Sequence, residues 1–287
     1  MTNFCVSLRL VALCFGSLAT GTNASTPPKP ARPVNYVVLL DLSDRLLAPD
    51  QARRDAALIQ AVFTRFEQGV RAQFIINAHD RFRVVIAPQR GIRYQTEPYM
   101  DALYLDLNST DMGHKRQRLD ALRADLPRQL SQLYAVATTG KKQARDFAGC
   151  DLWQYANEQL PTDLDPAYDN VLVVMTDGYF DFEHNTHALH EGNRATDARV
   201  TDRLRRDANW RQTLARPTEG LVPIRKKLPN LSVLVAEIKP KYDSLQEADL
   251  LMAVWQKWLT EMHVQKATCQ LRGSGPKALS ALQSFLK

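Results

Sequence analysis

The stretch YVVLLDLSDR, residues 36–45, is an apolar run that ends abruptly in an acid, a hydroxyl and another acid. A second stretch, VLVVMTDG at residues 171–178, repeats this pattern much later in the chain. Continuous runs of β-branched residues and leucine, without polar alternation, are typical of strands buried on both faces of a parallel sheet. Ligands bind at the carboxyl ends of such strands. Asp41, Ser43 and Asp177 are therefore the first candidates for function.

Strands and helices alternate along the rest of the chain. Further apolar runs predict strands at residues 81–87, 102–107, 231–238 and 264–269. Apolar spacings of three and four predict helices at residues 50–77, 115–136 and 247–262. We also expect helices at residues 151–160, at the highly charged residues 196–214, where few apolar positions mark an inner face, and after Pro276. Pro127 predicts a kink or break near Asp125. This alternation indicates a three-layer α/β fold, with a doubly wound, mostly parallel sheet and helices on both faces.

The N-terminus has the features of a secretory signal peptide. Arg9 precedes an apolar run at residues 10–19, and small residues lead to a cleavage site after Ala24. The apolar run is well short of the ~20 residues that a bilayer-spanning helix needs. We therefore expect residues 1–24 to be removed, which leaves a periplasmic or secreted protein without a transmembrane segment.

Composition and charge indicate one globular domain after this leader. Residues 25–34 are rich in proline and predict an extended linker. Residues 35–287 contain enough apolar side chains for one full core, and residues 179–216, which are polar and basic, predict a surface insertion in that domain. The net charge of +6 is modest and no basic run alternates with aromatic residues, so we expect no nucleic-acid partner.

Two cysteines, Cys150 and Cys269, remain once the leader is removed. An oxidising compartment would permit a disulfide between them. The alternative is a pair of separate buried thiols. The sequence leaves both open.

The two strand ends, Asp41-Leu42-Ser43 and Thr176-Asp177-Gly178, resemble those of the von Willebrand factor type A (VWA) family. The resemblance spans residues 35–287. It implies a divalent-cation site of the family's kind, in which an aspartate-x-serine-x-serine loop, a threonine from a second loop and an aspartate from a third bind the ion, usually Mg²⁺. A carboxylate of the partner then completes the metal shell.

The sequence departs from the family pattern at two positions. Arg45 replaces the second serine, where a guanidinium would repel a cation, or would pair with Asp41 or Asp177 and stand in for the metal. Cys150 replaces the threonine, and Asp151 beside it could supply an oxygen instead. The sequence therefore predicts either a Mg²⁺ or Mn²⁺ site or a metal-free fold in which the same groups cap strand and helix ends. The predicted metal ligands are Asp41, Ser43, Asp151 and Asp177.

A second polar cluster, DFEHNTHALH at residues 181–190, contains three histidines at spacings of three. On a helix these histidines could converge on zinc or copper, with Asp181 or Glu183 as a further ligand. The alternative is a solvated polar loop.

Three functions follow as hypotheses. The first is an exported interaction module without catalytic activity, which binds a protein partner through the rim near Asp41, Asp151 and Asp177. The second is a structural subunit of an envelope assembly with a vestigial site, which would make its contacts through the basic residues 203–211. The third is a metal-dependent phosphohydrolase with Asp41 as nucleophile, but Ser43 stands where that chemistry needs an acid. No Gly-x-Ser-x-Gly nucleophile elbow is present.

Overall fold

The computed structural model describes residues 1, 32–181, 189–241 and 244–287. All of its helices and strands belong to one compact unit, Arg32–Lys287. The predicted signal peptide and most of the predicted linker lie outside the described residues. Within the described ranges, no helix combines the length and the apolar character that crossing a membrane requires.

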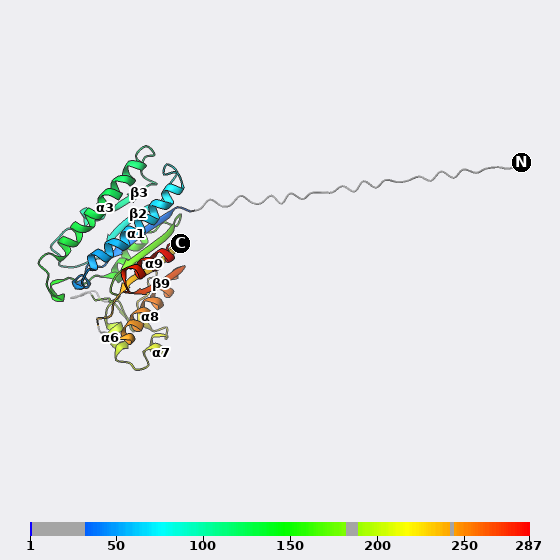
Figure 1. Ribbon diagram of the computed structural model, residues 1–287. Coiled ribbons are helices and arrows are strands. Elements are labelled where there is room, and N and C mark those ends of the chain that lie inside the picture. Colours follow the sequence, from blue (N-terminus) through cyan, green and yellow to red (C-terminus); the bar gives the residue numbers. More distant parts are fainter. Residues whose placement is uncertain (2–31, 182–188, 242–243) are drawn as a thin grey trace. The chain divides into compact units, whose positions relative to one another are not determined.

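A six-stranded sheet lies at the centre of this unit, in the order β3-β2-β1-β4-β8-β9 (Figure 1). β3 pairs antiparallel with β2, and the other pairings are parallel. The strands are β1 (Val34–Leu40), β2 (Arg81–Ile86), β3 (Tyr104–Asp106), β4 (Asp169–Met175), β8 (Leu231–Ile238) and β9 (Lys266–Leu271). The predicted α/β class with a mostly parallel sheet is confirmed, and β3 is the short edge strand expected near residues 102–107.

Helices cover both faces of the sheet. On one face lie α1 (Gln51–Ala72), α3 (Lys115–Thr138) and α9 (Gly275–Phe285), with α1 beside both of the others (Figure 1). On the other face lie α8 (Leu245–Glu261), α6 (Arg199–Arg205) and a helical segment after Cys150. The smaller elements on the two sides are η1 (Asp44–Leu47), α2 (Glu97–Ala102) and η2 (Ala144–Asp146).

The side chains of β1 alternate between these two layers. Tyr36, Val38 and Leu40 pack with α1, α3 and α9, whereas Val37 and Leu39 pack with the helices of the opposite face. Successive side chains of a strand point to opposite faces, so a strand covered on both sides must be apolar throughout. This double burial explains the unbroken apolar run from which the fold was predicted.

Two helices differ from the prediction. α1 ends at Ala72, and not near residue 77, because Phe74 and Ile75 have positive φ angles of 59° and 42° that a right-handed helix cannot include. Of the predicted kink or break near Asp125, the break is wrong, since α3 continues through Pro127 to Thr138. Buried leucines lie along α3 both before and after Pro127, so packing on the sheet stabilises the helix on both sides of the proline. These leucines are Leu119, Leu122, Leu126, Leu130 and Leu133.

The helical segment after Cys150 also continues past a proline. It consists of α4 (Leu152–Gln154), a π-helical turn η3 (Tyr155–Gln159) and α5 (Leu160–Asp163). The prediction that this helix ends before Pro161 is wrong. Pro161 lies in the first turn of α5, where its missing N–H costs no hydrogen bond.

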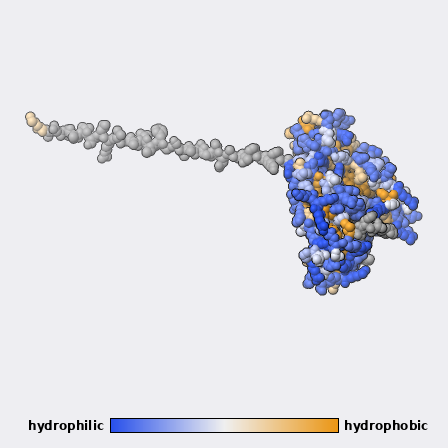
Figure 2. Space-filling view, turned by 180° about the vertical axis from the view of Figure 1, so that it is seen from behind, coloured by the Kyte–Doolittle hydropathy of each residue, from blue (hydrophilic) through white to orange (hydrophobic). Residues whose placement is uncertain are grey.

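The predicted helix at residues 196–214 is instead two short helices, α6 and α7 (Trp210–Leu214). Asp207 forms the turn between them, because its carboxylate accepts hydrogen bonds from Asn209 N at 2.8 Å and from Thr213 Oγ1. Beside these helices β5 (His190–Glu191), β6 (Asn193–Ala195) and β7 (Glu219–Leu221) form a small second sheet. The face of the molecule in Figure 2 is mainly hydrophilic, with hydrophobic residues in small scattered areas.

Candidate functional site

The carboxyl ends of β1 and β4 bring two acids to one rim of the sheet. Leu40 pairs with Met175, and the Asp41 amide donates to the Met175 carbonyl at 3.1 Å. Asp41 and Asp177 therefore follow directly from neighbouring strands, as the sequence predicted. Asp41 is only 2% exposed and Asp177 8% exposed, so the two carboxylates meet in a largely desolvated place.

Asp41 is held by its own loop and by the neighbouring strand end. Its Oδ1 accepts a hydrogen bond from the Ser43 amide at 2.9 Å, and its Oδ2 accepts one from Thr176 Oγ1 at 2.7 Å. Thr176 Oγ1 in turn accepts from the Gly178 amide at 3.1 Å. Thr176 was not among the predicted site residues, although its position directly before Asp177 marks it as part of the same strand end.

One carboxylate oxygen of Asp177 accepts no hydrogen bond from the described residues. The Tyr179 amide donates to its Oδ1 at 3.1 Å, and no described residue donates to its Oδ2. Burial, followed by the negative charge of Asp41, raises the pKa of Asp177 to about 7. Two carboxylates in a desolvated site disfavour each other's ionised form, and a cation between them removes that penalty.

Gly178 allows the backbone to turn away from the site directly after Asp177. Its φ of 96° is one that residues with a side chain rarely adopt. A Cβ at this position would also lie 3.0 Å from Cγ2 of Ile238. The glycine of the second motif is therefore required by both the backbone conformation and the close approach of β8.

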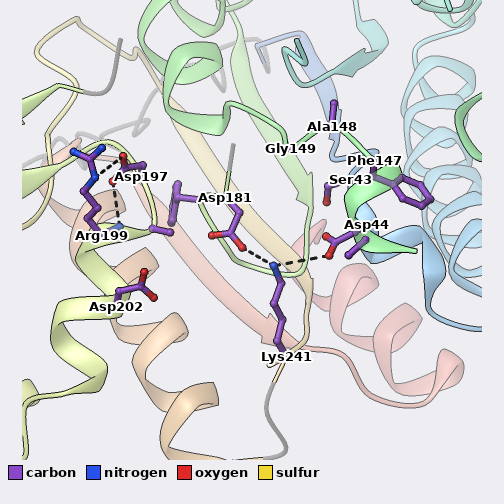
Figure 3. A pocket seen from close by; sticks show the side chains of 13 residues that line it. Ser43, Asp44, Phe147, Ala148, Gly149, Asp181, Asp197, Arg199, Asp202 and Lys241 are labelled. Atoms are coloured by element: carbon purple, nitrogen blue, oxygen red, sulfur yellow. Dashed lines mark hydrogen bonds and ion pairs between the residues drawn. The ribbon is translucent and has the colours of Figure 1, made fainter. Parts of the chain in front are cut away.

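Ser43 supplies a hydroxyl next to the two acids that makes no hydrogen bond within the described part of the chain. Its Oγ makes no hydrogen bond to any described residue, and it lines a pocket of about 260 Å³. Figure 3 shows this pocket between Ser43 and Asp44 on one side and Asp197 and Asp202 on the other. The structure thus brings Asp41, Ser43 and Asp177 together.

Arg45 does not pair with either rim carboxylate, so that expectation was wrong. The short helix η1 turns its side chain toward α1, where Nη1 and Nη2 donate to the two carboxylate oxygens of Asp55 at 2.7 and 3.0 Å. Nη1 also donates to the Asp41 carbonyl at 3.1 Å. Gln51 and Tyr134 donate to the same Asp55 carboxylate. The charge of Arg45 is therefore balanced by Asp55, beside the site and not within it.

The loop that carries Cys150 reaches the rim through Gln89, which was not predicted. Gln89 Nε2 donates to the Ala148 carbonyl at 2.8 Å and to the Leu42 carbonyl at 3.3 Å, and Gln89 forms an isolated bridge with Cys150. Gln89 lies in a loop beside Pro88, and nothing in its local sequence indicates this role.

Cys150 lies beside Asp41, where the VWA resemblance implies a threonine. Burial, with a smaller contribution from the Asp41 charge, raises the pKa of the Cys150 thiol well above its ordinary value. The disulfide considered from the sequence is not formed, since Cys150 and Cys269 are both free. Cys269 lies on the edge strand β9 and Cys150 in the loop before α4, which leaves two separate thiols.

Asp151 has a different environment from the three rim residues. It is the N-cap of α4, and its Oδ1 accepts a hydrogen bond from the Gln154 amide at 2.7 Å. Burial raises its pKa to about 6, and the charges with the largest effects on that pKa are those of Arg90, Glu158 and Asp197. One oxygen of the Asp151 carboxylate is used in capping the helix. The role of Asp151 as a metal ligand stays a prediction.

The basic insertion and the histidine segment offer no second site in the described residues. Arg203 pairs with Glu219, Arg205 with Glu247 and Arg211 with Asp249. These arginines are therefore balanced by acids of the same chain. Of the histidine segment, residues 182–188 lie outside the described residues, and His190 begins β5.

The donor atoms at the rim suit a hard cation. Among the described residues, no group of three or more His, Cys, Asp or Glu side chains is placed to hold a metal ion. Mg²⁺ nevertheless binds proteins through one or two carboxylates and keeps several of its waters. Asp41, Asp177 and the Ser43 hydroxyl meet that requirement.

Comparison with models of known protein families gives no match to this chain. Comparison with curated proteins gives none either. The fold class and the rim therefore rest on the chain's own residues.

Proposed function

We propose that residues 35–287 form a VWA-like interaction module, which binds a protein partner through a Mg²⁺ or Mn²⁺ ion at the carboxyl rim of the sheet. The observation that carries this proposal is the buried pair Asp41 and Asp177, two carboxylates on adjacent strand ends. Burial, followed by the charge of Asp41, raises the pKa of Asp177, and a divalent cation would let both carboxylates ionise.

Asp41, Ser43 and Asp177 would hold the ion, with waters and a carboxylate of the partner at the open positions. The hydrogen bonds from Ser43 N and Thr176 Oγ1 keep Asp41 in place for this role. Each carboxylate oxygen has two lone pairs, so an oxygen that accepts one hydrogen bond can still bind a metal. Arg45 supports the loop through its hydrogen bond to the Asp41 carbonyl, and Asp55 supplies its counter-charge.

The signal peptide expected from the sequence supports a location of this module in the periplasm or outside the cell. The structural-subunit alternative is less well supported, because the insertion arginines already have partners in the chain. Phosphoryl transfer is also less well supported, because Ser43 stands where that chemistry needs a second acid.

The test is a titration of the mature protein with MgCl₂ or MnCl₂ by isothermal calorimetry. We expect one site per chain that Asp177→Ala abolishes and Ser43→Ala weakens by roughly tenfold. Asp249→Ala is the matched control, since it removes one acid from an exposed ion pair away from the rim. A titration with no more heat than that of Asp177→Ala would contradict the proposal. Saturable partner binding that survives alanine at both Asp41 and Asp177 would contradict the assignment of the partner site.

A further inference from the structure

Lys241, in the loop after β8, places its ammonium between Asp44 and Asp181, two acids in the loops that carry the proposed ligands. Its Nζ donates to the carboxylate of Asp181 and lies 3.9 Å from Oδ2 of Asp44 (Figure 3). The same ammonium lies 4.8 Å from the centre of the Tyr179 ring. Lys241 therefore joins the loop after β1, the loop after β4 and the loop after β8.

Two cavities at this end of the sheet share Asp44 and Lys241 in their linings. Ser43 lines the first cavity, of about 260 Å³, and Asp177 lines a second one of about 300 Å³. Asp44 and Lys241 line both. Asp44 and Lys241 therefore lie near both the hydroxyl and the carboxylate of the proposed cation site.

The backbone of Lys241 is held by a hydrogen bond, whereas, among the described residues, its ammonium is held only by contacts with side chains. The Lys241 amide donates to the Tyr179 hydroxyl at 2.9 Å, and that hydroxyl donates to Glu247 Oε1 at 2.8 Å. The Lys241 side chain is 39% exposed. A lysine carries its charge on a flexible four-carbon chain. The ammonium can therefore leave Asp44 and Asp181 without a change in the loop.

The ammonium also acts on the rim acids. Its charge lowers the pKa of Asp177, which burial and Asp41 raise. A divalent cation bound to Asp177 would repel this ammonium, because like charges at short range in a partly desolvated site repel strongly.

We propose that Lys241 is a built-in competitor of the divalent cation: its ammonium partly balances the rim acids when no metal is bound, and moves away when a metal binds. The inference rests on the proposed function, since it needs the cation site. It assigns Lys241 a role in setting the metal affinity, and hence the conditions under which a metal-dependent partner can bind.

The experiment compares Mn²⁺ affinities by calorimetry for the wild-type protein, Lys241→Gln and Lys241→Arg at one pH and salt concentration. Lys241→Gln removes the competing charge and should bind Mn²⁺ about tenfold more tightly. Lys241→Arg keeps the charge and should bind like the wild type. Lys257→Gln is the control for net charge, because Lys257 pairs with Glu261 on α8. Thermal unfolding of each variant verifies that it is folded.

Each outcome decides between the proposals. If the wild type binds Mn²⁺ and Lys241→Gln binds equally or more weakly, the competitor role is wrong and the cation site stands. Equal tightening by Lys241→Arg would also overturn it, since charge would not be the cause. If Lys241→Gln binds Mn²⁺ and the wild type does not, the ammonium of the wild type prevents metal binding, which supports the competitor role. Binding by neither protein contradicts both the cation site and its competitor.

Discussion

Arg45 and Asp55 form a bidentate ion pair in which both side chains are buried. The Arg45 side chain is 3% exposed and that of Asp55 is fully buried. Arg45 also donates to the Asp41 carbonyl, so this pair supports the first rim loop from α1. A buried ion pair adds little net stability by itself, but the loss of one partner leaves an unbalanced charge.

We expect Asp55→Asn to lower the free energy of unfolding by about 3 kcal/mol, because Arg45 would remain buried without its counter-charge. Denaturant unfolding measures this change. Asp50→Asn is the matched control, since Asp50 pairs with Arg53 at the exposed start of α1 and should change stability by less than about 0.5 kcal/mol. Equal effects of the two substitutions would mean that the Arg45–Asp55 pair does not support the fold.

The raised pKa of Asp177 predicts how stability depends on pH in a chelator. The folded protein keeps the Asp177 proton up to about pH 7, whereas the unfolded chain loses it near the ordinary value of 3.8. Folding therefore favours the protonated form, and this contribution is present at low pH and is lost as the pH rises toward 7. At pH 8 we expect Asp177→Asn to be more stable than the wild type by on the order of 3 kcal/mol.

The measurement is denaturant unfolding of both proteins at pH 5 and pH 8 with a chelator present. The advantage of Asp177→Asn should be larger at pH 8 than at pH 5. Saturating Mn²⁺ should reduce that advantage at pH 8, because the ion binds the ionised wild-type site. If the stability difference between Asp177→Asn and the wild type does not change with pH, ionisation of Asp177 does not destabilise the folded protein.

Gly178→Ala should destabilise the protein by about 2 kcal/mol, through its positive φ and the contact with Ile238. Gly140→Ala is a graded control, since Gly140 also has a positive φ but no atom lies within 4 Å of the added Cβ. It should lose only about 1 kcal/mol. Thermal or denaturant unfolding measures both changes, and an equal loss in the two variants would exclude a role for β8 in requiring the glycine.

Cys150→Thr should raise the Mg²⁺ affinity by roughly tenfold, because it places a hydroxyl oxygen beside Asp41 where the thiol is a poor ligand for a hard cation. Calorimetric titration measures the change. Cys269→Ser, on the edge strand β9, should leave the affinity unaltered. If both cysteine variants bind like the wild type, the loop before α4 does not contribute to the ion's surroundings.

The strand interiors and their carboxyl ends were predictable because local sequence determines them. The runs at residues 36–41 and 171–177 are apolar for a reason that the fold explains, and their terminal acids meet because the strands are parallel neighbours. Helix ends were less predictable. Pro127 breaks a local rule, and the packing of α3 on the sheet outweighs it.

The surroundings of the rim could not be predicted, because they depend on residues far apart in the sequence. The partner of Arg45 is Asp55 on α1, and the Lys241 ammonium meets acids from two earlier loops. The bonds of Gln89 to Leu42 and Ala148 likewise join separate segments. A linear pattern gives residue types at strand ends, but the balance of charge between loops is a property of the folded chain.

Asp41 and Asp177 follow strands that are joined residue by residue from Val34–Asp169 to Leu40–Met175. The spacing between such strands is nearly constant, at about 4.8 Å in the hydrogen-bonding direction. The backbone positions of Asp41 and Asp177 therefore cannot move apart without breaking the hydrogen bonds between β1 and β4. An ion at this rim has to fit a preset gap, so we expect selection among divalent ions by radius, with the smaller Mg²⁺ and Mn²⁺ preferred to Ca²⁺.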